Sequence, residues 1–221
     1  MLVRLSKKKA HQIYKLANGT VVPGASTISK IGESQDFLTA WAHKRGLAGE
    51  DYRKITDEAA GIGSVAHFLV TCHFKGDSAD LSDFSQVEIQ GGSALFDRFK
   101  DMWAEQGLDF IVNELELVSE TYRYGGTLDI IGRNQNSELV LVDVKSSPRL
   151  YGHFYRQIAG YENLWNENNE EKISKRVIFR LDKKDARDDE VRPLPKDMTK
   201  HFNVFQKQLD LYYAFKALNN E

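Results

Sequence analysis

The stretch GGTLDIIGRNQNSELVLVDVKSS, residues 125–147, places three charged side chains inside two segments that otherwise have the pattern of buried strands. Charged residues are rarely buried unless they are paired or bound to a metal. Side chains alternate along a strand, so Asp143 and Lys145 share one face while Val142 and Val144 share the other. A turn within RNQNS would bring Asp129 to within about one residue of the antiparallel partner of Asp143. We therefore expect the three charged groups to meet in one small area.

This cluster has two interpretations. Two carboxylates held close together repel each other unless a cation lies between them, and Mg²⁺ or Mn²⁺ suits a site made of oxygen ligands. The alternative is a cross-strand salt bridge in which Lys145 pairs with either aspartate. The apolar neighbours, Leu139–Val142 and Val144 on one strand and Leu128, Ile130 and Ile131 on the other, indicate an interior position. A buried ion pair contributes little net stability, so this context favours a functional site.

Composition limits the class of protein. With 221 residues, 41% of them apolar, the chain can form a substantial core, and we expect one domain. The formal charge of -2 excludes attraction of nucleic acid by bulk positive charge but is compatible with a local basic groove. One cysteine, Cys72, excludes an internal disulfide and a four-cysteine metal centre, which indicates a reducing compartment such as the cytoplasm. Apolar runs of about 18 residues are absent and the start is rich in charge, so neither membrane insertion nor secretion is expected.

The periodicity predicts an α/β or α+β domain around one mixed sheet. A hairpin is expected around Asn18-Gly19, and a helix at 36–46 is expected to begin at Ser34 and to carry an apolar face of Phe37, Leu38, Trp41 and Ala42. Further helices are predicted at 57–74 (mostly buried), 93–106, 150–167 and 199–218, and strands at about 110–120, 123–133, 138–146 and 175–184. The acidic segment 76–86 is predicted to be a loop and the charge-rich segment 181–197 an exposed turn.

Within this single domain, 1–221, we expect an N-terminal hairpin and helical part at 1–107. A core sheet with its crossover helix is expected at 108–182, and a loop and helix at 183–221.

Four motifs occur in order along the chain: AGIGSVAH with His67, GGTLD with Asp129, VDVKSS with Asp143 and Lys145, and QIAGY with Gln157 and Tyr161. In this combination the chain resembles the PD-(D/E)XK nuclease superfamily, and within it the RecB-like exonuclease branch that includes Cas4-type, phage and mitochondrial maintenance exonucleases. The opening GTVVPGASTISKI also resembles this branch, although Ala25 departs from its usual pattern. The resemblance implies a restriction-endonuclease-like core, a central mixed sheet flanked by helices, with the N-terminal hairpin and helices added to it.

The resemblance also implies roles for individual residues. His67, Asp129, Asp143 and the carbonyl of Val144 would hold Mg²⁺ or Mn²⁺, and Lys145 would assist the attacking water. Gln157 and Tyr161, which are i and i+4 on one helical face, would shape the mouth of the site. With one cysteine in the chain, the iron–sulfur cluster of some members of this branch is not expected.

Several residues around these motifs are weaker candidates. Glu116 is a candidate for the second shell of the cluster, and Arg149, Arg156 and His153 are candidates for phosphate contacts, although a solvated helix face explains them almost as well. Tyr151, Phe154 and Trp165 are candidates for stacking on unpaired bases. Read alone, a histidine such as His67 on a partly apolar helix is more often an ordinary core residue.

The expected function is a divalent-metal-dependent DNA nuclease, acting as an exonuclease on DNA ends or single strands in replication, recombination or repair. The expected location is the cytoplasm of a bacterium or of a phage-infected cell. The chain has no phosphate-binding P-loop motif, so a helicase or recombination partner would be a separate polypeptide. The alternatives are an endonuclease of the same fold, a non-catalytic nucleic-acid-binding module, and a structural protein whose charged cluster is a salt-bridge network.

Overall fold

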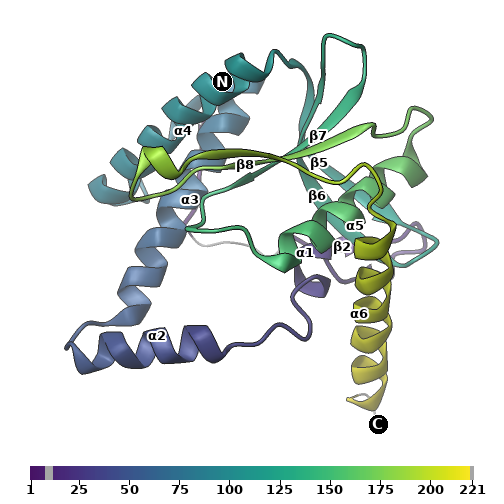
Figure 1. The fold of residues 1–221 in the computed structure, drawn as a ribbon, viewed down its shortest axis with the longest axis horizontal. Coiled ribbons are helices and arrows are strands. Elements are labelled where there is room, and N and C mark those ends of the chain that lie inside the picture. The colour runs from purple at the N-terminus through teal and green to yellow at the C-terminus, as the bar shows by residue number, and fades with distance from the viewer. Residues whose placement is uncertain (8–11, 220–221) are drawn as a thin grey trace.

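The computed structural model describes residues 1–7 and 12–219 and has a five-stranded mixed sheet at its centre (Figure 1). The strand order is β5 (Asp109–Ser119), β6 (Tyr124–Arg133), β7 (Leu139–Lys145), β8 (Lys175–Arg180) and β9 (Glu190–Pro193). The β7–β8 pair is parallel and the other neighbours are antiparallel. The nearly continuous apolar run of β7 explains its central place, because a strand covered on both faces needs no polar alternation. The mixed α/β fold expected from the sequence is confirmed.

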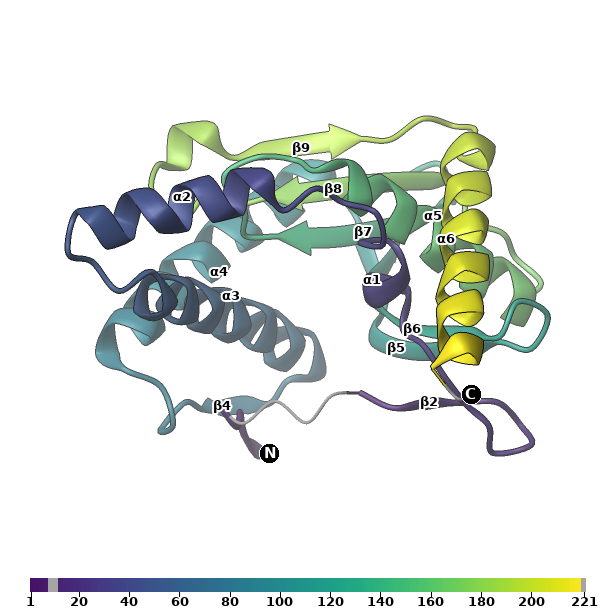
Figure 2. The same ribbon diagram turned by 90° about the horizontal axis from the view of Figure 1, so that it is seen from below.

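Helices cover both faces of this sheet, as Figures 1 and 2 show. On one face, α3 (Tyr52–Lys75) and α4 (Gln86–Gln106) enclose a cluster that contains Phe99 and Val142. On the other face, α1 (Ala25–Ile28), α5 (Gly152–Asn168) and α6 (Thr199–Leu218) enclose a cluster that contains Ile158 and Phe205. Neighbouring residues of β7 divide between the clusters, with Leu141 in the second and Val142 in the first. Strand alternation therefore places Asp143 on the face covered by α5.

Local capping explains why α3 and α4 begin before the predicted residues. Asp51 accepts a hydrogen bond from the backbone N–H of Arg53 at the start of α3. At the start of α4, Ser85 and Glu88 form a reciprocal capping box. The two helices also pack closely, because a Cβ at Gly92 would lie 2.4 Å from Val65. Only Gln86 of the segment predicted as a loop belongs to α4, which therefore begins seven residues before the predicted start at residue 93.

The N-terminal region contains two small sheets. The predicted hairpin is confirmed as β2 (Tyr14–Lys15) paired with β3 (Val21–Val22), with Gly19 at a positive φ of 83° in the turn. His11, at the start of the segment that predicted it, lies outside the described residues. The second sheet was missed: β1 (Leu2–Arg4) runs parallel to β4 (Ser78–Asp80), so the acidic segment 76–86 is not entirely a loop.

The helix α2 (Asp36–Leu47) does not pack as its pattern predicted. None of its 12 residues is buried, and Phe37 and Leu38, which belong to the apolar face of the helix, are exposed. It stands away from the sheet as an arm between α1 and α3 (Figure 1). The start also differs, since Gln35 takes the capping position and Ser34 Oγ accepts a hydrogen bond from the backbone N–H of Asp36. The first two turns of α3, next to this arm, are exposed as well, so that helix is only partly buried.

The charge-rich segment 181–197 is more ordered than predicted. It contains a short 3₁₀ helix, η1 (Ala186–Asp188), and the edge strand β9. β9 completes the sheet outside the range 108–182 in which the whole core sheet was expected. Its four residues include Glu190, Arg192 and Pro193, and a polar edge strand of this length has no hydrophobic period to detect.

Among the helices of the described residues, none combines the length and the apolar character that a membrane crossing requires.

Candidate active site

The site begins where β6 and β7 separate. Their ladder ends at the pair Ile130–Val142, so the next residues along, Asp129 and Asp143, lie at the mouth of the gap. One oxygen of Asp129, Oδ2, accepts a hydrogen bond of 2.8 Å from the backbone N–H of Val144. The N–H and C=O of a strand residue point the same way, so the carbonyl of Val144 is directed toward this gap too. The next carbonyl, of Lys145, points to the opposite side and accepts from Leu181 N at 2.8 Å.

Asp143 is a fully buried carboxylate with an incomplete set of partners. Lys145 Nζ lies 2.7 Å from its Oδ2, but neither carboxylate oxygen forms a hydrogen bond of proper geometry within the described residues. Desolvation raises the pKa of Asp143 to about 7, with Lys145 opposing and Asp129 adding to the shift. Burial lowers the pKa of Lys145, but the carboxylates of Asp143 and Asp129 outweigh it and hold that pKa above its ordinary value. Lys145 is therefore charged at neutral pH.

A second acid, Glu114, joins Asp129 from the neighbouring strand β5. It lies between the register pairs Asn113–Ile130 and Leu115–Leu128, which places it opposite Asp129. Each of His67, Glu114 and Asp129 offers one ligand atom within 4.8 Å of the others, and His67 Nδ1 is 3.9 Å from Asp129 Oδ2. This group of three can hold a metal ion.

Glu114 has two unusual properties. Its φ of 49° lies in the left-handed region, where a non-glycine residue is strained, and such strain is often found at functional sites. Desolvation and the nearby Asp129 carboxylate raise its pKa to about 7, with Lys75 opposing and Glu116 adding to the shift. Its side chain nevertheless belongs to an exposed residue, so solvent screens part of this effect.

Sequence reasoning missed Glu114 and named Glu116 instead. Glu116 pairs with Thr127, two residues further from the β6–β7 gap, and is exposed. The Glu-x-Glu pattern of this strand put both acids on one face, but the strand register was needed to choose between them.

The donor atoms around the β6–β7 gap fit a divalent cation. Asp129 and Glu114 offer carboxylate oxygens, and His67 a nitrogen, within 4.8 Å of one another. Asp143, which is not one of these three, adds buried oxygens without hydrogen bonds to the described residues. Carboxylate oxygens with a backbone carbonyl are typical ligands of hard divalent ions, and histidine joins them in many transition-metal sites. The Asp143 oxygens have no hydrogen bonds in the part of the chain that the structure describes, and a bound cation would supply the partner that they lack.

Gln157 and Tyr161 lie on α5, behind the two aspartates. Gln157 Nε2 donates a hydrogen bond of 2.7 Å to the Tyr161 hydroxyl, and both side chains are buried. Desolvation and the Asp129 and Asp143 carboxylates raise the pKa of Tyr161 well above its usual value. The ring fits closely because Gly126 has no side chain: a Cβ there would lie 2.7 Å from Tyr161 Cε1. The pair therefore forms a fixed wall of the site.

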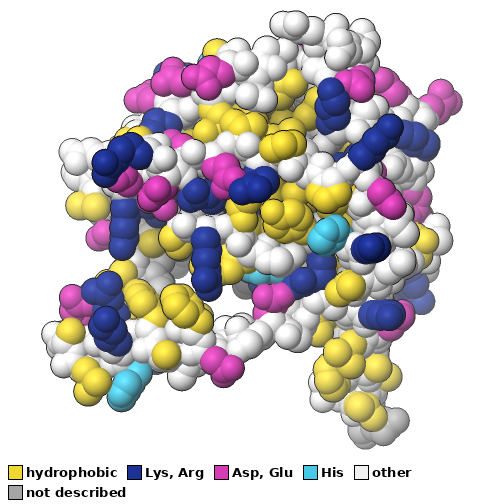
Figure 3. Space-filling model, viewed as in Figure 1, with side chains coloured by type: hydrophobic (Ala, Val, Ile, Leu, Met, Phe, Trp, Pro, Cys, Tyr) yellow, Lys and Arg dark blue, Asp and Glu magenta, His cyan; other side chains and the backbone are white. Residues whose placement is uncertain are grey.

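Two adjoining hollows of opposite character meet at this wall. The acidic hollow, of about 410 Å³, is lined by Leu5, Ser64, His67, Phe68, Thr71, Glu114, Thr127, Asp129 and Tyr161. The cationic hollow, of about 510 Å³, is lined by Ser26, Lys30, Ala59, Ala60, Gly63, Ser64, His67, Lys145, Ser146, His153, Phe154, Gln157 and Lys183. They share Ser64 and His67 on α3, so a ligand that spans both would pass over His67. Figure 3 shows Lys and Arg side chains along the recess between α2 and the sheet.

Some of the weaker candidates are engaged elsewhere. Trp165 is buried and its indole N–H donates to the carbonyl of Glu171, so its predicted stacking on a base is wrong. Arg156 donates to the carbonyl of Ser29 and forms an ion pair with Glu33, which leaves it poorly placed for a phosphate.

Other weak candidates lie at the cationic hollow or its rim. Phe154 is buried beneath Lys145, whose Nζ is 5.3 Å from the ring centre. His153, whose pKa is lowered by burial, lies 3.8 Å from Glu33 without a hydrogen bond to its Nδ1 in the described part of the chain. Arg149 is exposed and lies over both Phe37 and Tyr151, at 4.9 and 5.0 Å from the ring centres. The contact with Phe37 links the arm α2 to the turn after β7.

No known family model matches the sequence, and no curated protein matches it. Among solved structures, a protein from Eubacterium rectale described as a candidate exonuclease is 14% identical, covers 68% of this chain and 63% of its own, and gives a TM-score of 0.41. The protein SSO0001 is 16% identical, covers 59% of this chain and 63% of its own, and gives a TM-score of 0.35. The chain thus spans less than two thirds of the length of either structure. These are distant similarities.

Proposed function

We propose that this protein is a divalent-metal-dependent nuclease that hydrolyses phosphodiester bonds of DNA. The observation that carries the proposal is the buried carboxylate of Asp143, which has Lys145 at 2.7 Å, no hydrogen bonds in the described structure, and Asp129 across the strand gap. A salt-bridge network does not account for this arrangement, since both oxygens would then be expected to have hydrogen bonds. The motif resemblance to PD-(D/E)XK nucleases, which includes these residues and also His67, Gln157 and Tyr161, supports the same conclusion.

In this proposal Asp129, Asp143 and the carbonyl of Val144 hold Mg²⁺ or Mn²⁺, with His67 and Glu114 as further ligands. The ion, when bound, polarises the scissile phosphodiester and activates water. Lys145 remains protonated because its pKa is raised, so it donates hydrogen bonds that position the attacking water and stabilise the negative charge developing on the phosphoryl oxygens. Gln157 and Tyr161, joined by their hydrogen bond, shape the wall of the site next to β6.

An exonuclease mode is supported by the arm α2. The segment between α1 and α3 leaves the body of the protein and returns to it, and Phe37 at its start contacts Arg149 on the opposite rim. This bridge lies near the recess that contains the cationic hollow (Figures 1 and 3). A single strand with a free end could thread beneath such a bridge, whereas a closed strand could not. We therefore propose single strands and DNA ends as the substrates.

The test compares linear and circular single-stranded DNA of the same sequence, incubated with Mg²⁺, Mn²⁺ or EDTA. We expect metal-dependent loss of the linear strand, protection of the circle, and a decrease in kcat of roughly 10³-fold for Asp143→Asn and about 10²-fold or more for Lys145→Ala. Cleavage of the circle would indicate an endonuclease of the same fold. Binding of DNA without cleavage by any metal would favour a non-catalytic module, and equal cleavage by the variants would contradict the assigned site. An RNA strand of the same sequence tests the preference for DNA.

A further inference from the structure

Lys183, which lies outside the motifs, forms a pair with Ser146 at the wall of the cationic hollow. Ser146 follows the last residue of β7, and Lys183 comes three residues after the last residue of β8. Because β7 and β8 are parallel neighbours, their carboxyl ends lie side by side and bring these residues together. Lys183 Nζ donates to both the carbonyl and the Oγ of Ser146, the latter at 2.9 Å. Lys183 is thereby held close to Lys145, because its partner Ser146 is the next residue in the chain.

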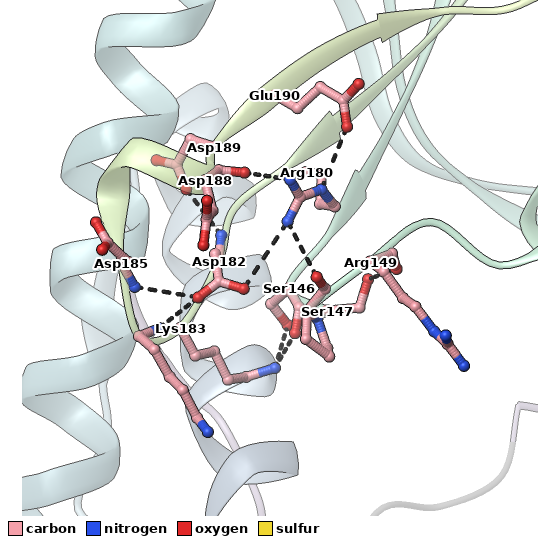
Figure 4. A network of polar contacts seen from close by, with 12 residues as sticks. Ser146, Ser147, Arg149, Arg180, Asp182, Lys183, Asp185, Asp188, Asp189 and Glu190 are labelled. Atoms are coloured by element: carbon pink, nitrogen blue, oxygen red, sulfur yellow. Dashed lines mark hydrogen bonds and ion pairs between the residues drawn. The ribbon is translucent and has the colours of Figure 1, made fainter. Parts of the chain in front are cut away.

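The loop that carries Lys183 is fixed by a network of hydrogen bonds and ion pairs (Figure 4). Asp182 Oδ1 accepts from the backbone N–H groups of Lys184 and Asp185 at 2.7 and 3.1 Å. Arg98, from α4, donates to the carbonyl of Asp182 at 2.6 Å and to Asp189 at 2.9 Å. This loop is therefore held rigidly, and Lys183 differs in this respect from a mobile surface lysine.

Arg180 connects the same network to the other side of the pair. It donates to the carbonyl of Pro148 at 3.4 Å, in the turn that follows Ser146, and forms ion pairs with Asp182 and Glu190 (Figure 4). Both sides of the Lys183–Ser146 contact are thus tied to the end of β8.

The chemistry of the cationic hollow favours an anion. Its described lining includes three lysines and two histidines and contains no Asp or Glu. The hydrogen-bond partners of Lys183 are both uncharged atoms of Ser146, and an ammonium group has three donors, so one donor and its charge are available to a ligand. Gly63 on the facing helix keeps the space open, because a Cβ there would lie 2.6 Å from Ser146 Oγ.

We propose that the Lys183–Ser146 pair is a binding subsite for the phosphate group adjacent to the scissile phosphodiester. This inference rests on the proposed nuclease function, because the hollow adjoins Lys145 and shares His67 with the acidic hollow. Lys183 is a positioning residue: it holds the neighbouring phosphate so that the scissile one lies between Lys145 and the two aspartates. An internal phosphodiester and a terminal phosphate have the same recognisable chemistry, and either can occupy the subsite.

The first test separates binding from chemistry with Lys183→Gln, whose amide can still donate to Ser146, and with Lys184→Gln as the matched control on the exposed side of the same loop. On linear single-stranded DNA we expect Lys183→Gln to raise KM about 10-fold while kcat changes less than about 3-fold, as for the loss of one charge-assisted hydrogen bond. Lys183→Arg should restore most of the KM, and Lys184→Gln should match the wild type. A melting temperature for Lys183→Gln close to that of the wild type shows that the fold is intact.

The second test locates the phosphate on the substrate. A series of oligonucleotides, each with one neutral methylphosphonate linkage, should contain one position next to the cleaved bond that raises KM for the wild type but not for Lys183→Gln. Strands without a terminal phosphate show whether the phosphate in the subsite is terminal or internal. Equal KM values for Lys183→Gln and Lys184→Gln, or the same linkage penalties in wild type and Lys183→Gln, would overturn the subsite while leaving the nuclease proposal intact. A wild type that cleaves none of these strands would overturn both.

Discussion

The acidic and the cationic hollow differ in how their charged groups are held. In the acidic hollow, Asp129 and Glu114 project from neighbouring strands of the central sheet. In the cationic hollow, Lys30 and Lys183 come from segments outside the sheet, and only Lys145 comes from a strand. Charges fixed by a sheet suit a metal ion, whose ligand distances must be exact to a few tenths of an ångström. Charges that come from several separate segments suit a strand of repeating phosphates, which contacts more than one element along its length.

The largest effect that separates the two hollows is expected at Glu114. If it is a metal ligand, Glu114→Gln should weaken Mn²⁺ binding about 10- to 100-fold, because a ligand carboxylate is replaced by a neutral amide. Glu116→Gln is the matched control on the same face of β5 and should change the affinity less than about 3-fold. Calorimetric titration of Mn²⁺ measures both. Equal losses for the two variants would show that general negative charge, and not a ligand position, determines the affinity.

A smaller effect is expected on stability in the absence of metal. Burial raises the folded pKa of Asp143 to about 7, above the value of about 4 that an aspartate has in an unfolded chain. Between these values the folded protein binds more protons than the unfolded one, so this residue makes the free energy of unfolding fall as pH rises from about 4 to about 7. Asp143→Asn has no such proton, so its stability relative to the wild type should increase over this window.

Thermal unfolding in EDTA at several pH values between 5 and 8 measures this difference. The comparison of two proteins at each pH cancels the other titrating groups. A difference in melting temperature that is constant across the window would contradict the raised pKa. Added Mn²⁺ should remove the disadvantage of the wild type, since the cation takes the place of the proton.

The smallest effect is expected at the rim of the cationic hollow. Lys30 is exposed, so solvent and salt screen its charge. Lys30→Gln should raise KM for single-stranded DNA only about 2-fold at physiological salt, and more at low salt. Lys207→Gln, on an exposed part of α6, is the control with the same change in charge. If Lys30→Gln raised KM as much as Lys183→Gln does, the electrostatic field of the whole protein, and not a specific subsite, would attract the substrate.

The sequence was sufficient to predict the regions whose apolar residues recur with a strong helical or strand period. The three strands before α5, the β8 strand and the terminal helix follow from apolar patterns, and the alternation of β7 correctly put Asp143 and Lys145 on one face. The proximity of Asp129 to the partner of Asp143 also followed from the turn length.

Other features depend on contacts distant in sequence. The arm α2 has an apolar pattern but no surface to bury it against, and β9 joins the sheet through backbone pairing with β8 and lacks an apolar period. Glu114 could be placed opposite Asp129 only once the register of β5 was known, and its left-handed backbone has no sequence signature in a residue other than glycine. Trp165 was misread because an aromatic residue on an amphipathic helix has the same pattern whether it packs inward or binds a base.

The most direct test of the metal site is diffraction from crystals grown with Mn²⁺, measured at a wavelength where manganese scatters anomalously. We expect an anomalous peak within ligand distance of both the Asp129 and Asp143 carboxylates, at about 2.0–2.3 Å from their oxygens. The peak should disappear in Asp143→Asn crystals grown in the same way. A peak elsewhere, or none in wild-type crystals while Lys145 remains paired with Asp143, would contradict the metal site and favour a structural salt bridge.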